Sequence, residues 1–78
     1  MENVVFSIYG SNLSNCRQVE LSDNYGNNAY CHVRSAGVSS IECIVQWIFK
    51  DAGSISATLY DNAGEIMYEI KMFTQNSR

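Results

Sequence analysis

The sequence predicts an α+β domain in which one helix packs on one face of a mostly antiparallel sheet, in the element order βββαββ. Several segments carry apolar residues at every second position, as strands do. One segment carries them at spacings of three and four, as helices do. At 78 residues, the chain is long enough for one domain. We expect residues 1–73 to form it and residues 74–78 to be a flexible tail.

Three short strands are expected in the first half of the chain. Val4, Phe6 and Ile8 alternate in a first strand that stops at Gly10. A second strand is expected over residues 17–21 and a third over residues 29–35, joined by a polar, turn-rich loop. In the third strand, one face carries Ala29, Cys31 and Val33, and the other carries Tyr30, His32 and Arg34.

The helix is expected from about Ser40 to Ala52. Ser39 followed by Glu42 has the spacing of a capping box, and Gly53 stands where a helix would end. The apolar residues between them form a helical stripe: Ile41, Ile44, Val45, Ile48, Phe49 and Ala52. Ile48 lies near the middle of this stripe, so we expect it to be fully buried.

An alternative fold is a small sandwich of six strands without a helix. It requires residues 40–49 to be a strand, which the stripe, the cap and the terminal glycine argue against. The Val38–Ile41 run (VSSI) resembles βγ-crystallin modules. The resemblance covers only those four residues, so we assign the chain to no family.

A hairpin is expected after the helix. Ile55, Ala57 and Leu59 alternate in one strand, and the turn Asp61–Gly64 suits a type I turn completed by a glycine bulge. The return strand is expected over residues 65–73. One side of it would carry Ile66, Tyr68, Ile70 and Met72. No internal repeat is evident.

Composition excludes several classes of partner. The net charge is −3, and the five Lys and Arg residues are scattered singly. Binding to nucleic acid through phosphates needs a clustered positive face, so we expect no direct nucleic-acid partner. The longest apolar runs are only a few residues, so we expect no membrane-spanning segment.

The chemistry of the chain predicts no enzyme, metal site or cofactor. Cys31 and His32 are successive strand residues and face opposite sides of the sheet, so they cannot form a nucleophile pair. Glu65 and Glu69 are separated by about 13 Å on a strand, whereas glycosidase pairs need roughly 5 to 9.5 Å. No sequence motif for zinc, calcium or phosphate binding occurs.

The cysteines leave two compartments open. Cys16, Cys31 and Cys43 are odd in number and lack the short spacings of metal sites. We expect three reduced thiols in a cytoplasmic protein. The alternative is a secreted domain with one disulfide and one spare thiol.

Two surfaces are candidates for partner contact. On the expected helix, Trp47 points about 120° away from the centre of the apolar stripe and Cys43 points further out. With Lys50 they would form an exposed helix edge, unless Trp47 folds onto the sheet rim and Cys43 packs on Val38. The second surface is the open sheet face, which would carry Tyr30, His32, Arg34 and Tyr60.

These observations together predict a small, non-enzymatic binding protein that acts by protein–protein contact. It would be an inhibitor or adaptor, with a protein partner or as a homodimer. Phage-encoded and mobile-element inhibitors, anti-CRISPR proteins among them, have this size and acidic character. The alternative is a secreted effector or toxin-like domain with one disulfide.

Overall fold

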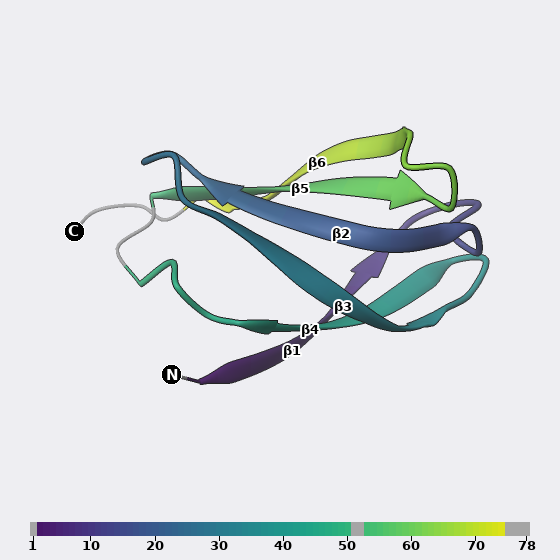
Figure 1. The fold of residues 1–78 in the computed structure, drawn as a ribbon, viewed down its shortest axis with the longest axis horizontal. Coiled ribbons are helices and arrows are strands. Elements are labelled where there is room, and N and C mark those ends of the chain that lie inside the picture. The colour runs from purple at the N-terminus through teal and green to yellow at the C-terminus, as the bar shows by residue number, and fades with distance from the viewer. Residues whose placement is uncertain (1, 51–52, 75–78) are drawn as a thin grey trace.

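The computed structural model describes residues 2–50 and 53–74, and their fold is all-β. The strands are β1 (Asn3–Tyr9), β2 (Cys16–Asp23), β3 (Asn28–Ala36), β4 (Ser40–Gln46), β5 (Ser54–Asp61) and β6 (Ile66–Thr74). They form one antiparallel sheet in the order β1-β4-β3-β2-β5-β6 (Figure 1). The predicted α+β class is therefore wrong. Of the expected tail, Thr74 ends β6 and residues 75–78 lie outside the described residues.

The sheet curls into a half-barrel because β3 changes partners along its length. Residues 28–31 pair with β2, whereas His32 to Ala36 pair with β4. β3 consequently crosses from the layer of β2, β5 and β6 to the layer of β4 and β1 (Figure 1). β1 and β6 are the two edges of the sheet. The described residues contain no helix long and apolar enough to cross a bilayer.

Residues 40–50 of the segment expected to be helical form β4 and the start of the following loop, and residues 51–52 of that expected helix lie outside the described residues. Ile41, Cys43 and Val45 alternate inward and are 1%, 0% and 4% exposed. The capping-box residues have other roles. Ser39 lies in the β3–β4 turn, and Glu42 forms an ion pair with Arg34 across strands, with 3.8 Å between Oε1 and Nε. β-branched side chains every few positions favour a strand here, because they pack well on a pleated surface.

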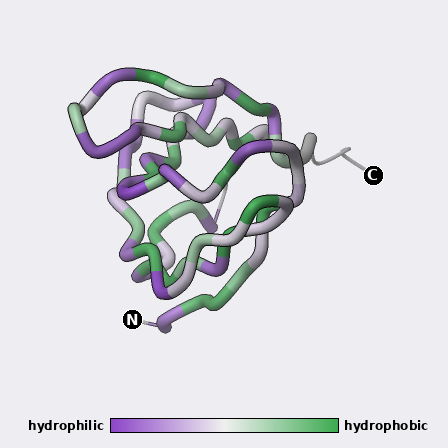
Figure 2. The backbone as a smooth tube through the Cα atoms, turned by 90° about the vertical axis from the view of Figure 1, so that its right-hand side faces the viewer, coloured by the Kyte–Doolittle hydropathy of each residue, from purple (hydrophilic) through white to green (hydrophobic). Residues whose placement is uncertain are grey.

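The core fills the concave side of the half-barrel. Hydrophobic and hydrophilic stretches follow one another along the chain (Figure 2), and in β1 to β5 the more buried residues mostly alternate with the more exposed ones. The buried residues are Ile8, Leu13, Cys16, Val19, Leu21, Cys31, Ile41, Cys43, Val45, Phe49, Ile55, Ala57 and Leu59. None of the described buried residues is polar or charged. Hydrophobic burial inside one curled sheet therefore holds the fold together.

Register shifts adjust which side chains face outward. The shift between Val33 and Ser35 leaves one extra residue on β3 opposite β4, which is a bulge. A second shift lies in the β5–β6 pair, where Leu59 opposes Tyr68 but Tyr60 opposes Ile66. Ile66 therefore lies on the outer face with Tyr60 and is 55% exposed. The expectation that Ile66 shares a face with Tyr68 and Ile70 is wrong for this reason.

The β5–β6 hairpin has the same layout as the β2–β3 hairpin, a structural likeness between segments in which the sequence shows no evident repeat. Each bound of β5 and β6 lies 38 positions after the corresponding bound of β2 and β3 (16 to 54, 23 to 61, 28 to 66 and 36 to 74). The turns of both hairpins contain a glycine with a positive backbone angle: φ is 86° at Gly26 and 82° at Gly64. In each turn an aspartate, Asp23 or Asp61, accepts two backbone N–H bonds through Oδ1.

Candidate interaction surface

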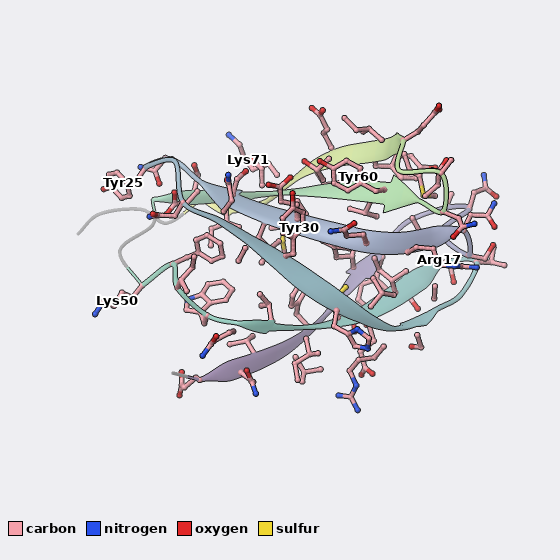
Figure 3. All side chains as sticks on the ribbon, in the orientation of Figure 1. Arg17, Tyr25, Tyr30, Lys50, Tyr60 and Lys71 are labelled. Carbon is pink, nitrogen blue, oxygen red and sulfur yellow. The ribbon has the colours of Figure 1, made fainter. Side chains whose placement is uncertain are left out.

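The outer face of β3 carries three of the residues singled out from the sequence. Tyr30, His32 and Arg34 are exposed, whereas Cys31 is buried and Val33 half-buried on the inner face. The predicted division of β3 into two faces is confirmed. Tyr30 is 63% exposed and points outward from the part of β3 that pairs with β2 (Figure 3).

Tyr60 joins this face from β5, through a carboxylate on β2. Glu20 lies directly opposite Tyr30 in the β2–β3 register and opposite Thr58 in the β2–β5 register. The Tyr60 hydroxyl donates a hydrogen bond to Glu20 Oε1 at 3.0 Å. Glu69 is the register partner of Thr58 on β6, so it extends the same row. We call Glu20, Tyr30, Tyr60 and Glu69 the tyrosine face.

The electrostatics of the tyrosine face favour cations. The hydrogen bond to Glu20 raises the pKa of the Tyr60 hydroxyl, and partial desolvation and the charges of Glu20, Tyr30 and Glu69 raise it further. Glu20 and Glu69 are the negative groups beside the two aromatic rings, and Lys71, the register partner of Ser56, is the cation on the same outer face of β6. A positive group placed between the rings would interact favourably with both the rings and the carboxylates.

The expected helix edge does not exist. Cys43 is 0% exposed within β4, because its side chain faces the core. Trp47 is half-buried just after β4, and its ring meets that of Phe49 edge-on at 5.2 Å and 82°. Lys50 is exposed at the end of the molecule that also holds Tyr25 (Figure 3). The structure therefore does not bring Trp47, Cys43 and Lys50 together on one exposed surface.

Ile48 is 40% exposed, so the prediction that it is fully buried is wrong. With Lys50 it lines an open depression of about 400 Å³, together with Asp23, Tyr25 and Asn27. The carboxylate in this depression belongs to Asp23, and it already accepts hydrogen bonds from its own turn. Asp23 accepts bonds from the backbone N–H groups of Tyr25 and Asn27 and from the Asn27 side chain, at 2.8 to 2.9 Å.

These bonds also set the ionisation of Asp23. Desolvation alone would raise its pKa, but the hydrogen bonds from Asn27 and Tyr25 outweigh it and lower the pKa. Asp23 therefore stays ionised and shapes the β2–β3 turn, and it is not free to act as an acid.

The three thiols are free and buried. Burial raises the pKa of Cys31 to about 12, with a smaller contribution from Cys43. Burial likewise raises the pKa of Cys43 to about 11, followed by the charges of Cys16 and Glu42. Burial also raises the pKa of Cys16. A thiol held in the protonated form is a poor nucleophile and a poor metal ligand.

No metal-binding cluster is present in the part of the chain that the structure describes, which holds no group of three or more suitable His, Cys, Asp or Glu residues. Cys31 and His32 point to opposite faces of β3, as expected.

Glu20 was not among the candidate residues predicted from the sequence. Its position between Val19 and Leu21 in an alternating strand already placed it on the outer face.

The chain matches no family model, and no curated protein or solved structure shows significant similarity to it.

Proposed function

We propose that the chain is a small binding protein whose tyrosine face contacts a basic side chain of a protein partner. The observation that carries this proposal is the pairing of Tyr30 and Tyr60 around Glu20, with Glu69 beside them. His32 and Arg34 extend the contact along β3 as its rim. An exposed tyrosine, Tyr30, and a half-buried one, Tyr60, beside two carboxylates are suited to an arginine or lysine side chain.

The energetics support a protein contact on this face. Tyrosine is enriched among residues that dominate binding energy, since it offers a large rigid surface and loses little conformational entropy on binding. The bond to Glu20 holds Tyr60 in place before a partner arrives, which lowers the ordering cost further. The net charge of −3 would also speed encounter with a basic partner at low salt.

The alternative function, a secreted effector with one disulfide, has no supporting observation. Cys16, Cys31 and Cys43 are all free, and all three lie in the core.

The proposal is tested with Tyr30→Ala and a matched control, Tyr25→Ala. Tyr25 is 65% exposed, close to the 63% of Tyr30, but it lies in the β2–β3 turn away from the tyrosine face. A partner captured from the native host by the wild-type chain is purified and its affinity measured for each variant. Tyr30→Ala should lose about 2 kcal/mol or more of binding, and Tyr25→Ala should bind as wild type.

Glu20→Gln tests the charge. It keeps the shape of the side chain but removes its charge, so it should weaken binding and flatten its dependence on salt. Equal affinities of the wild type, Tyr30→Ala and Glu20→Gln would show that the partner binds elsewhere.

A further inference from the structure

β1 is an edge strand, and among the described residues no backbone group pairs with its free side. It pairs with β4 alone, in a register that joins Asn3 to Gln46 and Tyr9 to Ser40 without a shift. Trp47 N–H donates to the Glu2 carbonyl, and Gly10 N–H donates to the Ser39 carbonyl, at 2.9 and 3.0 Å. In an antiparallel pair, bonding alternates along the strand. The even-numbered residues of β1 therefore bond to β4.

It follows that the odd-numbered residues of β1 point their N–H and C=O groups to the free side. These residues are Asn3, Val5, Ser7 and Tyr9. Their side chains also lie on the outer surface, where Val5 is 49% and Tyr9 78% exposed. Exposed, regular edges of this kind are templates for pairing with another strand.

β1 lacks the usual protection of an edge. Its sequence, Asn3–Tyr9 (NVVFSIY), has no charged residue, and the whole chain has no proline. The other edge differs. β6 presents Glu69 and Lys71, which are exposed, and its pairing with β5 contains two register shifts. Charges and bulges on an edge discourage pairing, so β1 is the edge open to a partner strand.

The sequence of β1 is self-complementary. If two copies of β1 pair antiparallel about Phe6, each residue meets its mirror position: Val4 meets Ile8, Val5 meets Ser7 and Asn3 meets Tyr9. Odd residues then oppose odd residues, so the free N–H and C=O groups of both strands bond to each other. The inner side is apolar throughout, and no like charges face each other. The pairing with β4 is centred on Phe6 in the same way, with Cys43 as its partner.

We propose that two copies of the chain associate through β1, antiparallel about Phe6, which joins their two sheets into one. A two-fold contact uses the same strand of both copies and satisfies both free edges at once. This inference does not depend on the tyrosine face, which lies on β2, β3, β5 and β6.

The first test measures the mass of the full chain by sedimentation equilibrium. The wild type should be a dimer. Val5→Lys places a charge on the paired edge and should raise the dimer dissociation constant by about tenfold or more. Val38→Lys is the matched control, because Val38 is 67% exposed but lies in the β3–β4 turn. It should dimerise as wild type.

A second variant removes only the backbone donor. Ser7→Pro deletes an N–H on the free side and leaves the ladder to β4 intact, so it should dissociate the dimer without unfolding the chain. Circular dichroism of each variant checks folding. A wild-type monomer up to roughly 1 mM, or equal dissociation constants for the wild type, Val5→Lys and Ser7→Pro, would overturn the proposal.

The register is tested by mixing two cysteine variants, Val5→Cys and Ser7→Cys. The pairing about Phe6 places position 5 opposite position 7 of the second copy, within disulfide distance. The mixture should therefore cross-link, while the buried native thiols stay reduced. Faster cross-linking of Val5→Cys with itself would contradict the register. Tyr30→Ala should leave the dimer unchanged, which separates this interface from the proposed partner site.

Discussion

Ile48 and Phe49 are neighbours in the chain but lie in opposite environments. Phe49 is 3% exposed and its ring packs against Trp47, whereas Ile48 is 40% exposed beside Lys50. After β4 ends, the chain still turns alternate residues inward, so Phe49 covers the open end of the core. At this end of the core, Phe49 therefore contributes more to the stability of the fold than Ile48 does.

Replacing each residue with alanine should reveal the difference between the two environments as a difference in lost stability. Phe49→Ala should destabilise the fold by about 3 to 5 kcal/mol, because it removes a buried ring and leaves a cavity. Ile48→Ala should cost less than about 1 kcal/mol, since much of the side chain is already in water. Chemical denaturation of both variants measures the difference. A larger loss for Ile48→Ala would mean that Ile48, and not Phe49, is the buried residue at this end of the core.

At the scale of elements, the two matching hairpins depend on left-handed glycines. Gly26 and Gly64 have φ of 86° and 82°, and no atom lies within 4 Å of where a Cβ would stand at either position. A residue with a side chain would be destabilised at either position by the strain of the positive φ, and not by a steric clash.

Gly26→Ala and Gly64→Ala should each lower the free energy of unfolding by about 1 kcal/mol. Gly37→Ala is the control. Gly37 has no positive φ, and its added Cβ would lie at an ordinary 3.5 Å from the Ser40 carbonyl, so its effect should stay within about 0.5 kcal/mol. Similar losses at all three positions would argue against the turn geometry.

Five of the six strands, the last hairpin among them, could be predicted because apolar residues alternate along them. The helix was wrongly predicted because residues 41–49 satisfy both periods. Ile41, Ile44, Val45 and Ile48 suit a helix, while Ile41, Cys43, Val45 and Phe49 suit a strand. Short apolar runs do not distinguish the two. Many of these residues are β-branched or aromatic, and a period of two leaves Glu42 on the outer face with Arg34.

The candidate surface was predictable only in part. Alternation placed Tyr30, His32 and Arg34 on one face, and the structure agrees. The contribution of Glu20 was missed, because the pairing of β2 between β3 and β5 brings together residues that are 40 positions apart, as Glu20 and Tyr60 are. Strand order is a long-range property that alternation does not encode. The role of these residues in binding stays a prediction.

For the molecule as a whole, the buried thiols link stability to pH. In the unfolded chain Cys31 and Cys43 ionise near their ordinary pKa of 9.0, whereas in the folded chain they keep their protons to about 12 and 11. Their contribution to stability is therefore complete below pH 9. Above it, the unfolded state loses protons that the folded state keeps, so stability falls.

Each thiol should reduce the free energy of unfolding by up to about 1.4 kcal/mol per pH unit between its two pKa values. Urea denaturation from about pH 8 to pH 11 measures this slope. Cys31→Ala should be less steep than wild type, because one titrating group is gone, even though the variant is less stable at every pH. Equal slopes would show that Cys31 ionises freely in the folded state.

The order of strands in the sheet also governs what happens while the chain is being synthesised. Of the six described strands, β1 leaves the ribosome first, yet the strand it pairs with among them is β4, which begins at Ser40. About 30 residues after β1, which include β2 and β3, must therefore emerge before β4 can pair with the uncharged β1, and of the described hairpins only β2–β3 can form in the meantime. At the usual rates of synthesis this leaves β1 unpaired for roughly a few seconds. In a polysome, where many nascent copies are close together, that interval is when two β1 strands could meet before either chain has folded.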